Sequence, residues 1–538
     1  MRSSVPRTFR QITRNATRLN VPRCRASGAR WSSTAAAAEE EGHKWSTPLA
    51  KQLTEAITTT GPIPVASYMR QCLTSDLGGY YTPKTSSQND QFGTKGDFVT
   101  SPEISQIFGE LIGLWVVAEW IAQGRRGAGV YLMEMGPGRG TLMDDMLRTI
   151  RNFPPLAKAI EAVYLVEASQ NLRLAQHKLL CGENPLTENS IGHESTSKYS
   201  PDLRIIWAED VRFIPQDPTK TPFMIAHEFF DALPIHVFQS VPPPQPPKEG
   251  DAADTIETPT GPIKNPRRLP QGHQWRELVV SPTPLHRLNE GEPEFELTMA
   301  KAATPHSMYL PETSSRYKAL KDVDGATIEI SPESLAYARD FAIRLGGSNP
   351  ETSPPSQPAA GRKAVASAPR EEAVMKDEPS GAALIIDYGP ASNIPANSLR
   401  GIKQHTRVSP FTSPGTTDVS ADVDFLALAG SAINSSPGVE VHGPVSQALF
   451  LTAMGIEERA AQLVKKAMVE KGRTGEGKEE LTEVVKRIEG GWQRLVDLSP
   501  QGMGGLYQVM AMLPFRPEQF GEEGKKRRPV GFGGDVRL

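Results

Sequence analysis

The sequence predicts an α/β fold in which a doubly wound parallel sheet is covered by helices on both faces. Short apolar strands alternate with helical patterns between residues 129 and 240, and a further apolar strand, ALIIDYG, follows at 383–389. Consecutive strands separated by helices pair in parallel, because each connection has to cross a face of the sheet. The strand VYLMEM at 130–135 also runs into a glycine-rich turn and then a helix, which is typical of a Rossmann-like core.

A helix is expected before this first strand, at 102–121. Its apolar residues recur at helical spacing. Thr100 and Glu103 have the spacing of a capping box, and Pro102 suits a first helical turn. We therefore assign residues 46–128 to an N-terminal helical segment that precedes the core at 129–240.

Two later stretches, 241–270 and 348–380, are rich in proline, serine and charge. They hold too few large apolar residues to join a core, so both are predicted to be disordered insertions. Between them, residues 271–347 combine strand patterns with one helical pattern, SLAYARDFAIRL. This part is predicted to be an inserted α+β region.

The segment 381–515 is predicted to complete the core and to add C-terminal helices. Strand patterns near 400–408, 438–442 and 506–513 are expected to close the edge of the sheet as antiparallel strands. The last residues, 516–538, are basic and rich in glycine, which predicts a flexible tail.

The N-terminus indicates where the protein works. The first 38 residues hold eight arginines, no lysine and no acidic residue. Such an arginine-rich, serine-containing segment is typical of a mitochondrial transit peptide, which we assign to residues 1–40. Without these eight positive charges the formal net charge falls from −3 to −11 for residues 39–538. A chain this acidic is a poor general binder of nucleic-acid phosphates, so nucleic acid is not expected as a partner.

Three cysteines, Cys24, Cys72 and Cys181, stand far apart and include no C-x-x-C pair. A disulfide scaffold or a structural metal site is therefore not expected, and a reducing compartment fits. The sequence also lacks an unbroken apolar stretch of the ~18 residues that a membrane-spanning helix needs. No transmembrane segment is expected.

The glycine-rich turn is the first candidate site. A dinucleotide-binding fingerprint would require glycine or alanine where this chain has Thr141, which weakens an NAD-dependent function. With an acid two residues before its first glycine, the turn instead resembles motif I of class I S-adenosylmethionine (SAM) methyltransferases. The resemblance implies SAM as the cofactor, bound by Gly136, Gly138 and Gly140, with Glu134 near the ammonium of SAM.

Acidic residues also end the next two strands. Glu167 follows the second strand, where it would accept hydrogen bonds from ribose hydroxyls. The third strand ends in Glu209-Asp210, and Asp210 is placed to meet the adenine amino group. Each acid alone is also compatible with a solvated strand end. Three in succession after a glycine turn favour a cofactor site.

Several segments resemble the MidA family, the mitochondrial complex I assembly-factor methyltransferases, which are described as protein arginine methyltransferases. In chain order these are GDFVTSPEISQIFGELIGLW (96–115), EMGPGRGTLMDDMLR (134–148), YLVEAS (164–169), AHEFFDALPIHVF (226–238), IIDYG (385–389) and PGTTDVSADVDF (414–425). The resemblance implies a class I methyltransferase core with an inserted substrate-recognition region. It also implies symmetric dimethylation, in the mitochondrial matrix, of an arginine on iron–sulfur subunit 2 of complex I (NADH:ubiquinone oxidoreductase) during assembly. Monomer and homodimer stay open.

The segment HEFFDALP at 227–234 follows the fourth strand, whose carboxyl end should face the methyl group of SAM. A guanidinium stays protonated at physiological pH, so the enzyme has to bind it, orient one nitrogen and favour loss of a proton. Carboxylates bind guanidinium through paired hydrogen bonds. We therefore expect Glu228, and after it Asp231, to be catalytic, with the two phenylalanines between them as walls or packing. Asp231 as a helix cap remains an alternative. For His227 a structural hydrogen-bonding role is expected ahead of a role as proton acceptor.

The segment DFVTSPE at 97–103 lies upstream of the core. Such an N-terminal element is expected to fold over SAM, with Thr100, Ser101 and Glu103 as lid or substrate-proximal residues. The alternative is a capped helix start without a binding role.

Two other functions stay open. One is a SAM methyltransferase that acts on another substrate. Enzymes that methylate amino groups of nucleobases or glutamine usually carry an N/D-P-P-Y/F turn after the fourth strand, where this chain has HEFFDALP. The other is a non-catalytic assembly chaperone that retains the fold, which the intact glycines of the turn disfavour.

Overall fold

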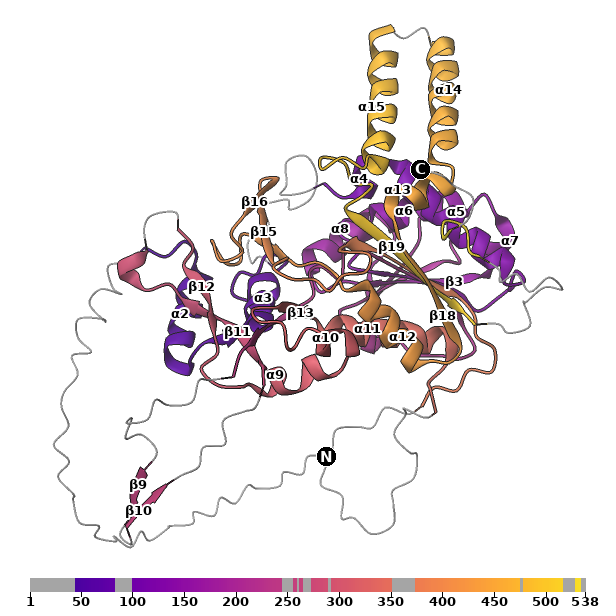
Figure 1. Ribbon diagram of the computed structural model, residues 1–538. Helices are drawn as coiled ribbons and strands as arrows, with labels where there is room; N and C mark the ends of the chain where they lie inside the picture. The colour runs from indigo at the N-terminus through magenta and orange to yellow at the C-terminus, as the bar shows by residue number, and fades with distance from the viewer. Residues whose placement is uncertain are drawn as a thin grey trace, which may run out of the picture. The chain divides into compact units, whose positions relative to one another are not determined.

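The strand predicted at 130–135 lies in the middle of a nine-stranded sheet in the described part of the chain. The computed structural model (Figure 1) describes residues 44–82, 99–243, 255–258, 261–264, 272–288, 292–350, 373–474, 478–515 and 528–533. In spatial order the strands are β18 (Val439–Ser446), β19 (Tyr507–Pro514), β14 (Ala382–Tyr388), β7 (Thr221–His227), β2 (Val130–Met135), β3 (Ile160–Val166), β6 (Arg204–Ala208), β5 (Gly192–Thr196) and β4 (Thr187–Glu188). The five strands from β14 to β6 are parallel, and antiparallel strands extend both edges.

Successive side chains of a strand point to opposite faces of the sheet. Helices cover both faces of the parallel strands, so both sets of side chains are buried. In β2, Val130 and Leu132 join a core with helices on one face, whereas Tyr131 and Met133 join a separate core on the other. The first face is covered by α5 (Gln106–Ala122), α6 (Thr141–Ile150), α7 (Pro154–Ala159), α8 (Gln170–Cys181) and α13 (Gln447–Ala453), and the second by α11 (Pro332–Gly346) and α12 (Phe425–Ser435). The doubly wound α/β prediction is confirmed.

The helix predicted at 102–121 is divided into α4 (Ser101–Ile104) and α5. Ser105 separates them because its backbone is extended, with φ −154°, and its Oγ accepts a hydrogen bond from the Ile107 N–H at 3.3 Å. The predicted capping box is present, since the Thr100 N–H donates to Glu103 Oε2 at 3.2 Å. Two long helices, α14 (Ile456–Thr474) and α15 (Lys478–Val496), pack together and extend away from the sheet (Figure 1).

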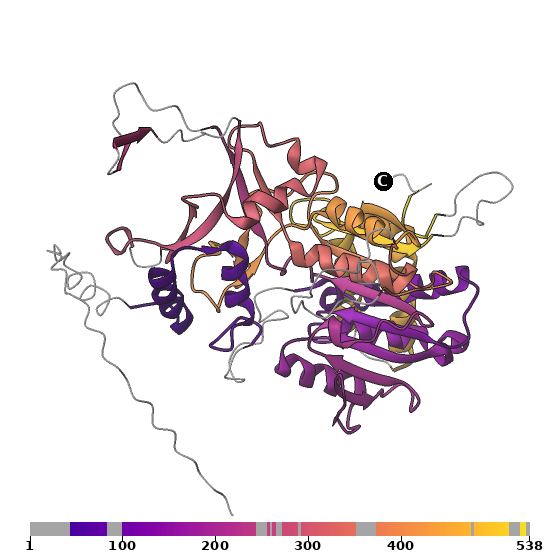
Figure 2. The same cartoon turned by 90° about the horizontal axis from the view of Figure 1, so that it is seen from below.

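A second sheet joins three separate parts of the sequence. It contains β1 (Ile63–Pro64), β8 (His236–Val241), β11 (Gln274–Pro282), β12 (Phe295–Met299) and β13 (Thr327–Ile330). Helices α2 (Pro48–Thr60) and α3 (Val65–Thr74) pack against it, and α9 (Pro305–Tyr309) and α10 (Ser315–Lys318) lie in the same region. Figure 2 shows this sheet beside the nine-stranded one. Because β8 follows HEFFDALP directly, that segment connects the two sheets.

One predicted edge strand was wrong. The pattern near 400–408 does not extend the large sheet but forms a separate three-stranded sheet from β15 (Arg400–Lys403), β16 (Thr406–Val408) and β17 (Asp418–Ser420). The other two edge strands are confirmed as β18 and β19. Helix α11, which falls in the predicted inserted region, packs on the large sheet.

Several predictions fall wholly or partly outside the described residues. The transit peptide at 1–40 does so entirely, and the insertions at 241–270 and 348–380 and the tail at 516–538 do so in part. Within the first insertion, β9 (Thr255–Thr258) pairs antiparallel with β10 (Gly261–Lys264). Within the tail, Phe532 packs on Phe450, with ring centroids 5.6 Å apart. In the part of the chain that the structure describes, no helix is both long and apolar enough to cross a membrane.

Replacing Leu384 by alanine tests whether β14 is buried within the large sheet. Leu384 is fully buried, so Leu384→Ala should lower the free energy of unfolding by about 2–5 kcal/mol through lost burial and a new cavity. Urea unfolding followed by circular dichroism measures this. Leu174→Ala on α8 is the control, because Leu174 is 52% exposed and its loss should change stability by less than about 0.5 kcal/mol. Equal effects would contradict the assigned core.

Candidate functional site

A cavity of about 380 Å³ lies where the carboxyl ends of the parallel strands meet. This volume is in the range of small-molecule sites, and its place at the strand ends is where α/β sheets bind ligands. Most residues predicted from the sequence line it: Thr100, Glu103, Glu134, Gly136, Gly138, Glu167, Glu228 and Asp231. Tyr388, Arg400 and Tyr337 also line it and were not predicted.

The glycine turn after β2 needs glycine for its backbone. Gly136 has φ +57° and Gly138 φ +53°, a region that other residues rarely adopt. A Cβ on Gly136 would also lie 3.0 Å from Cδ2 of Phe229, so this glycine allows the turn and the HEFFDALP segment to approach closely. Gly140 precedes α6 and packs on Gln176 and, unlike the other two glycines, is not part of the cavity wall.

Glu134 and Glu167 are buried side by side at the ends of β2 and β3. Glu167 accepts hydrogen bonds from the Ser169 N–H at 2.8 Å and from Gln176 Nε2 at 3.3 Å. Oε2 of Glu134 has no hydrogen-bond partner among the described residues. Burial, and after it the nearby Glu167, raises the pKa of Glu134 to about 8, and burial raises the pKa of Glu167 to about 7.

This pair fits the polar groups of SAM. A buried carboxylate oxygen without a partner is costly, and a ligand ammonium would satisfy it. A second carboxylate at the next strand end suits ribose hydroxyls. The donor set therefore matches the cofactor that the sequence predicts.

The third predicted acid, Asp210, is turned away from this pair. Its carboxylate accepts from Arg212 Nε at 2.9 Å and Nη2 at 2.7 Å, and it is not among the residues that line the cavity. Glu209 lines the cavity instead, with Oε1 3.1 Å from Nη2 of Arg173. Both residues follow the end of β6, so strand alternation alone did not distinguish them.

The HEFFDALP segment turns sharply at Glu228. Glu228 has φ +50°, a conformation that costs a non-glycine residue roughly 1–3 kcal/mol and needs support from its surroundings. Asp387 on the neighbouring strand gives that support. Its buried carboxylate accepts from the N–H groups of Phe229 at 3.1 Å and Phe230 at 2.8 Å. The strained turn directs Glu228 to the cavity.

Aromatic residues fix the Glu228 carboxylate. Its Oε1 accepts a hydrogen bond from the Tyr507 hydroxyl at 2.9 Å, and Tyr507 is also bonded to the Tyr388 hydroxyl. Burial, and after it the nearby Asp231, raises the pKa of Glu228 to about 8. His227 stacks on Tyr507, and burial lowers the pKa of His227 to about 3, so this imidazole is neutral.

Asp231 already has a cationic neighbour. Nη2 of Arg400 lies 4.0 Å from its Oδ2, and Arg400 also pairs with Asp422 at 2.6 Å and lies over the Tyr388 ring. Burial raises the pKa of Asp231 to about 6, and the Arg400 charge opposes this. Among the described residues Glu228 is paired with neutral partners, so it can accept a cationic ligand at lower cost than Asp231.

The predicted lid residues divide into two groups. Thr100 and Glu103 line the cavity, whereas Ser101 is fully buried and is not part of its lining. The Ser101 backbone N–H nevertheless stabilises the charged form of Glu228 and lowers its pKa, against the larger effect of burial. The residues immediately before, 83–98, lie outside the described part of the chain.

Comparison with known proteins gives one family. Residues 111–445 match the family described as "Putative S-adenosyl-L-methionine-dependent methyltransferase". The chain is 32% identical over 485 residues to the Rattus norvegicus protein named Protein arginine methyltransferase NDUFAF7, mitochondrial, with 89% of this chain and 87% of that protein covered. Its identity to the Homo sapiens protein of the same name is 30%, with 90% and 87% covered.

A solved structure has the same fold. It is a COG1565 superfamily member from Burkholderia thailandensis bound to S-adenosyl-homocysteine. The TM-score is 0.54 at 20% sequence identity, and the match covers 90% of this chain and 95% of that one.

Replacing Glu134 by glutamine should stabilise the ligand-free protein at pH 8. Because the folded pKa of about 8 exceeds the ordinary 4.5, folded Glu134 binds more protons, and stability falls as pH rises from about 4.5 to 8. Glu134→Gln removes part of this fall, which thermal melts at pH 5 and pH 8 would measure.

The same variant should bind SAM on the order of tenfold to a hundredfold more weakly, since it loses a charged hydrogen bond. A pH dependence equal to that of the wild type, together with unchanged SAM affinity, would contradict this account of Glu134.

Proposed function

The chain belongs to this family of S-adenosyl-L-methionine-dependent methyltransferases, and on that basis we propose that it methylates arginine in a protein substrate. SAM is its cofactor. The finer proposal is symmetric dimethylation of an arginine on iron–sulfur subunit 2 of mitochondrial complex I during its assembly, in the mitochondrial matrix. The names of the Rattus and Homo sapiens relatives support arginine as the acceptor.

One observation carries the proposal. Glu228 is a largely buried carboxylate, with its side chain 13% exposed, directly after β7 and beside the glycine turn, and its hydrogen-bond partner Tyr507 is neutral. A guanidinium is permanently charged and presents paired N–H donors, which suit a carboxylate. Such a ligand would supply the positive charge that the described surroundings of Glu228 do not.

Bound SAM supplies an activated methyl group on its sulfonium. Glu134 and Glu167 would hold its ammonium and its ribose, because they lie at the ends of β2 and β3. Glu228 binds the substrate guanidinium and orients one nitrogen toward the methyl group. Such positioning accounts for several kcal/mol of a typical enzymatic barrier.

The same carboxylate handles the proton. Without a cation, burial favours the protonated form of Glu228, and a guanidinium beside it would favour the charged form. In the transfer the bond between the methyl group and sulfur would break as the bond to nitrogen forms, and Glu228 would accept the proton that the nitrogen loses. Tyr507 and the Ser101 N–H hold this carboxylate at the edge of the cavity that would receive the substrate. Asp231 has a secondary role through its pair with Arg400.

Glu228→Gln should keep SAM affinity and reduce turnover at least a hundredfold, because the amide can neither carry the charge nor accept the proton. Mass spectrometry of methylarginine on purified iron–sulfur subunit 2 measures turnover, and calorimetry measures SAM binding. Glu161→Gln is the control and should leave turnover unchanged. Glu161 lies on β3, is partly exposed, pairs with Lys220 and does not line the cavity. Turnover unchanged in Glu228→Gln would exclude this role, and SAM binding by the wild type without any transfer would favour the chaperone alternative.

Tyr507→Phe removes only the hydroxyl that fixes Glu228. Loss of one hydrogen bond to a charged group should lower kcat on the order of tenfold. KM for the protein substrate should change less, because the carboxylate still contacts the guanidinium. A change confined to KM would show that Tyr507 shapes substrate binding and does not position Glu228.

A further inference from the structure

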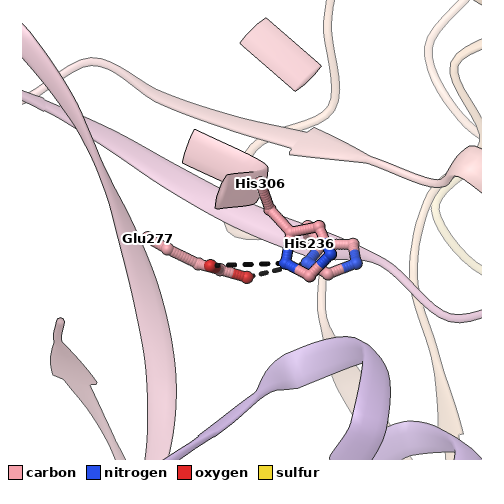
Figure 3. A group of neighbouring side chains, drawn as sticks. All are labelled: His236, Glu277 and His306. Carbon is pink, nitrogen blue, oxygen red and sulfur yellow. Dashed lines mark hydrogen bonds and ion pairs between the residues drawn. The ribbon is translucent and has the colours of Figure 1, made fainter. Parts of the chain in front are cut away.

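We propose that His236, Glu277 and His306 form a binding site for a divalent transition-metal ion, with Zn²⁺ as the best match. The three side chains come from β8 and β11 of the second sheet and from α9 (Figure 3), and none of them lines the cavity described above. Each offers one ligand atom, and these atoms all lie within 4.8 Å of one another. Two imidazoles and a carboxylate are ligands that zinc accepts, with a further position left for water.

The carboxylate of Glu277 faces the Nδ1 atoms of both imidazoles from one side. Its Oε1 is 2.7 Å from Nδ1 of His236, and its Oε2 is 3.8 Å from Nδ1 of His306. The two imidazole rings lie side by side with centroids 4.2 Å apart, and both face Glu277 (Figure 3). The three ligand atoms belong to segments that are far apart in the sequence, so only the tertiary fold brings them together.

Hydrogen bonds hold this arrangement before any ion binds. Glu277 is fully buried, and its Oε2 accepts from the Thr304 hydroxyl at 2.5 Å. Thr304 also caps α9, accepting from the Ser307 N–H at 3.1 Å. One residue therefore links the carboxylate to the helix that carries His306. Because His236 and Glu277 are already held in place and Thr304 supports the helix of His306, few side chains have to become ordered when an ion binds.

Small movements complete the geometry. Zinc ligands lie about 2.0–2.2 Å from the ion, so Glu277 and His236 have to separate slightly and His306 has to approach. The side chain of His306 is 48% exposed and has room to do so. The ion takes the place of the hydrogen bond between His236 Nδ1 and Glu277 Oε1, and the neutral imidazole of His236 then carries its proton on Nε2. The open position then faces the exposed side, next to His306.

The sequence predicted no metal site, because it shows no closely spaced ligand pair. His236 and Glu277 are 41 residues apart and meet only through the pairing of β8 with β11. A bound ion would cross-link β8, β11 and α9. Because β8 begins shortly after the Glu228–Asp231 turn, the ion would also stiffen the support of that turn.

Zinc titration of the full-length, tag-free protein tests this. Calorimetry should give one Zn²⁺ per chain, and the melting temperature should rise with Zn²⁺ but not with Mg²⁺. His306→Ala should weaken binding at least tenfold without changing the circular dichroism spectrum, since His306 is partly exposed. The matched control is His273→Ala, because His273 lies near the same sheet and outside the cluster, and its zinc affinity should match the wild type.

A rescue variant identifies the ligand directly. His306→Cys should regain affinity and give bound Co²⁺ a thiolate charge-transfer band that the wild type lacks. No zinc binding by the folded wild-type chain would overturn the proposal. So would equal binding by His306→Ala, or the absence of the thiolate band in His306→Cys.

Discussion

Buried negative charge without matching positive charge is the constraint around which the site is organised. Glu134, Glu167, Glu228 and Asp231 all line one cavity at the ends of parallel strands, and burial raises the pKa of each. Arg400 partly balances Asp231, and Arg173 partly offsets the charge of Glu167. A cationic ligand would offset the cost of burying such a group of acids. SAM and a guanidinium each bring a positive charge.

The scaffold holds these acids by backbone geometry and by neighbouring strands. Positive φ angles at Gly136 and at Glu228 bring the two turns together, and Asp387 on β14 stabilises the second turn. Tyr507, from the antiparallel strand β19, reaches the same carboxylate. The antiparallel strand β19 therefore contributes a residue to the site in addition to extending the sheet.

Patterns among residues close in the sequence predict most of the fold and the residues expected to bind the cofactor. Alternating strands and helices predict the parallel sheet, and a glycine turn flanked by acids predicts where Glu134 and Glu167 meet, because both depend on residues close in the sequence. Tyr388, Tyr507 and Arg400 were missed, since their contacts with Glu228 and Asp231 depend on strand pairing between distant segments. The strand near Arg400 was assigned to the wrong sheet for the same reason. The break at Ser105 was hidden by apolar spacing that continues across it.

The most direct test measures protons released when SAM binds. Calorimetric titrations at pH 7 in two buffers with different heats of ionisation give the number of protons exchanged. If Glu134 and Glu167 are partly protonated in the ligand-free protein and ionise beside the ammonium, binding releases protons, and Glu134→Gln releases fewer. Tight binding with no proton release, equal in wild type and variant, would contradict the claim that uncompensated buried carboxylates form the cofactor site.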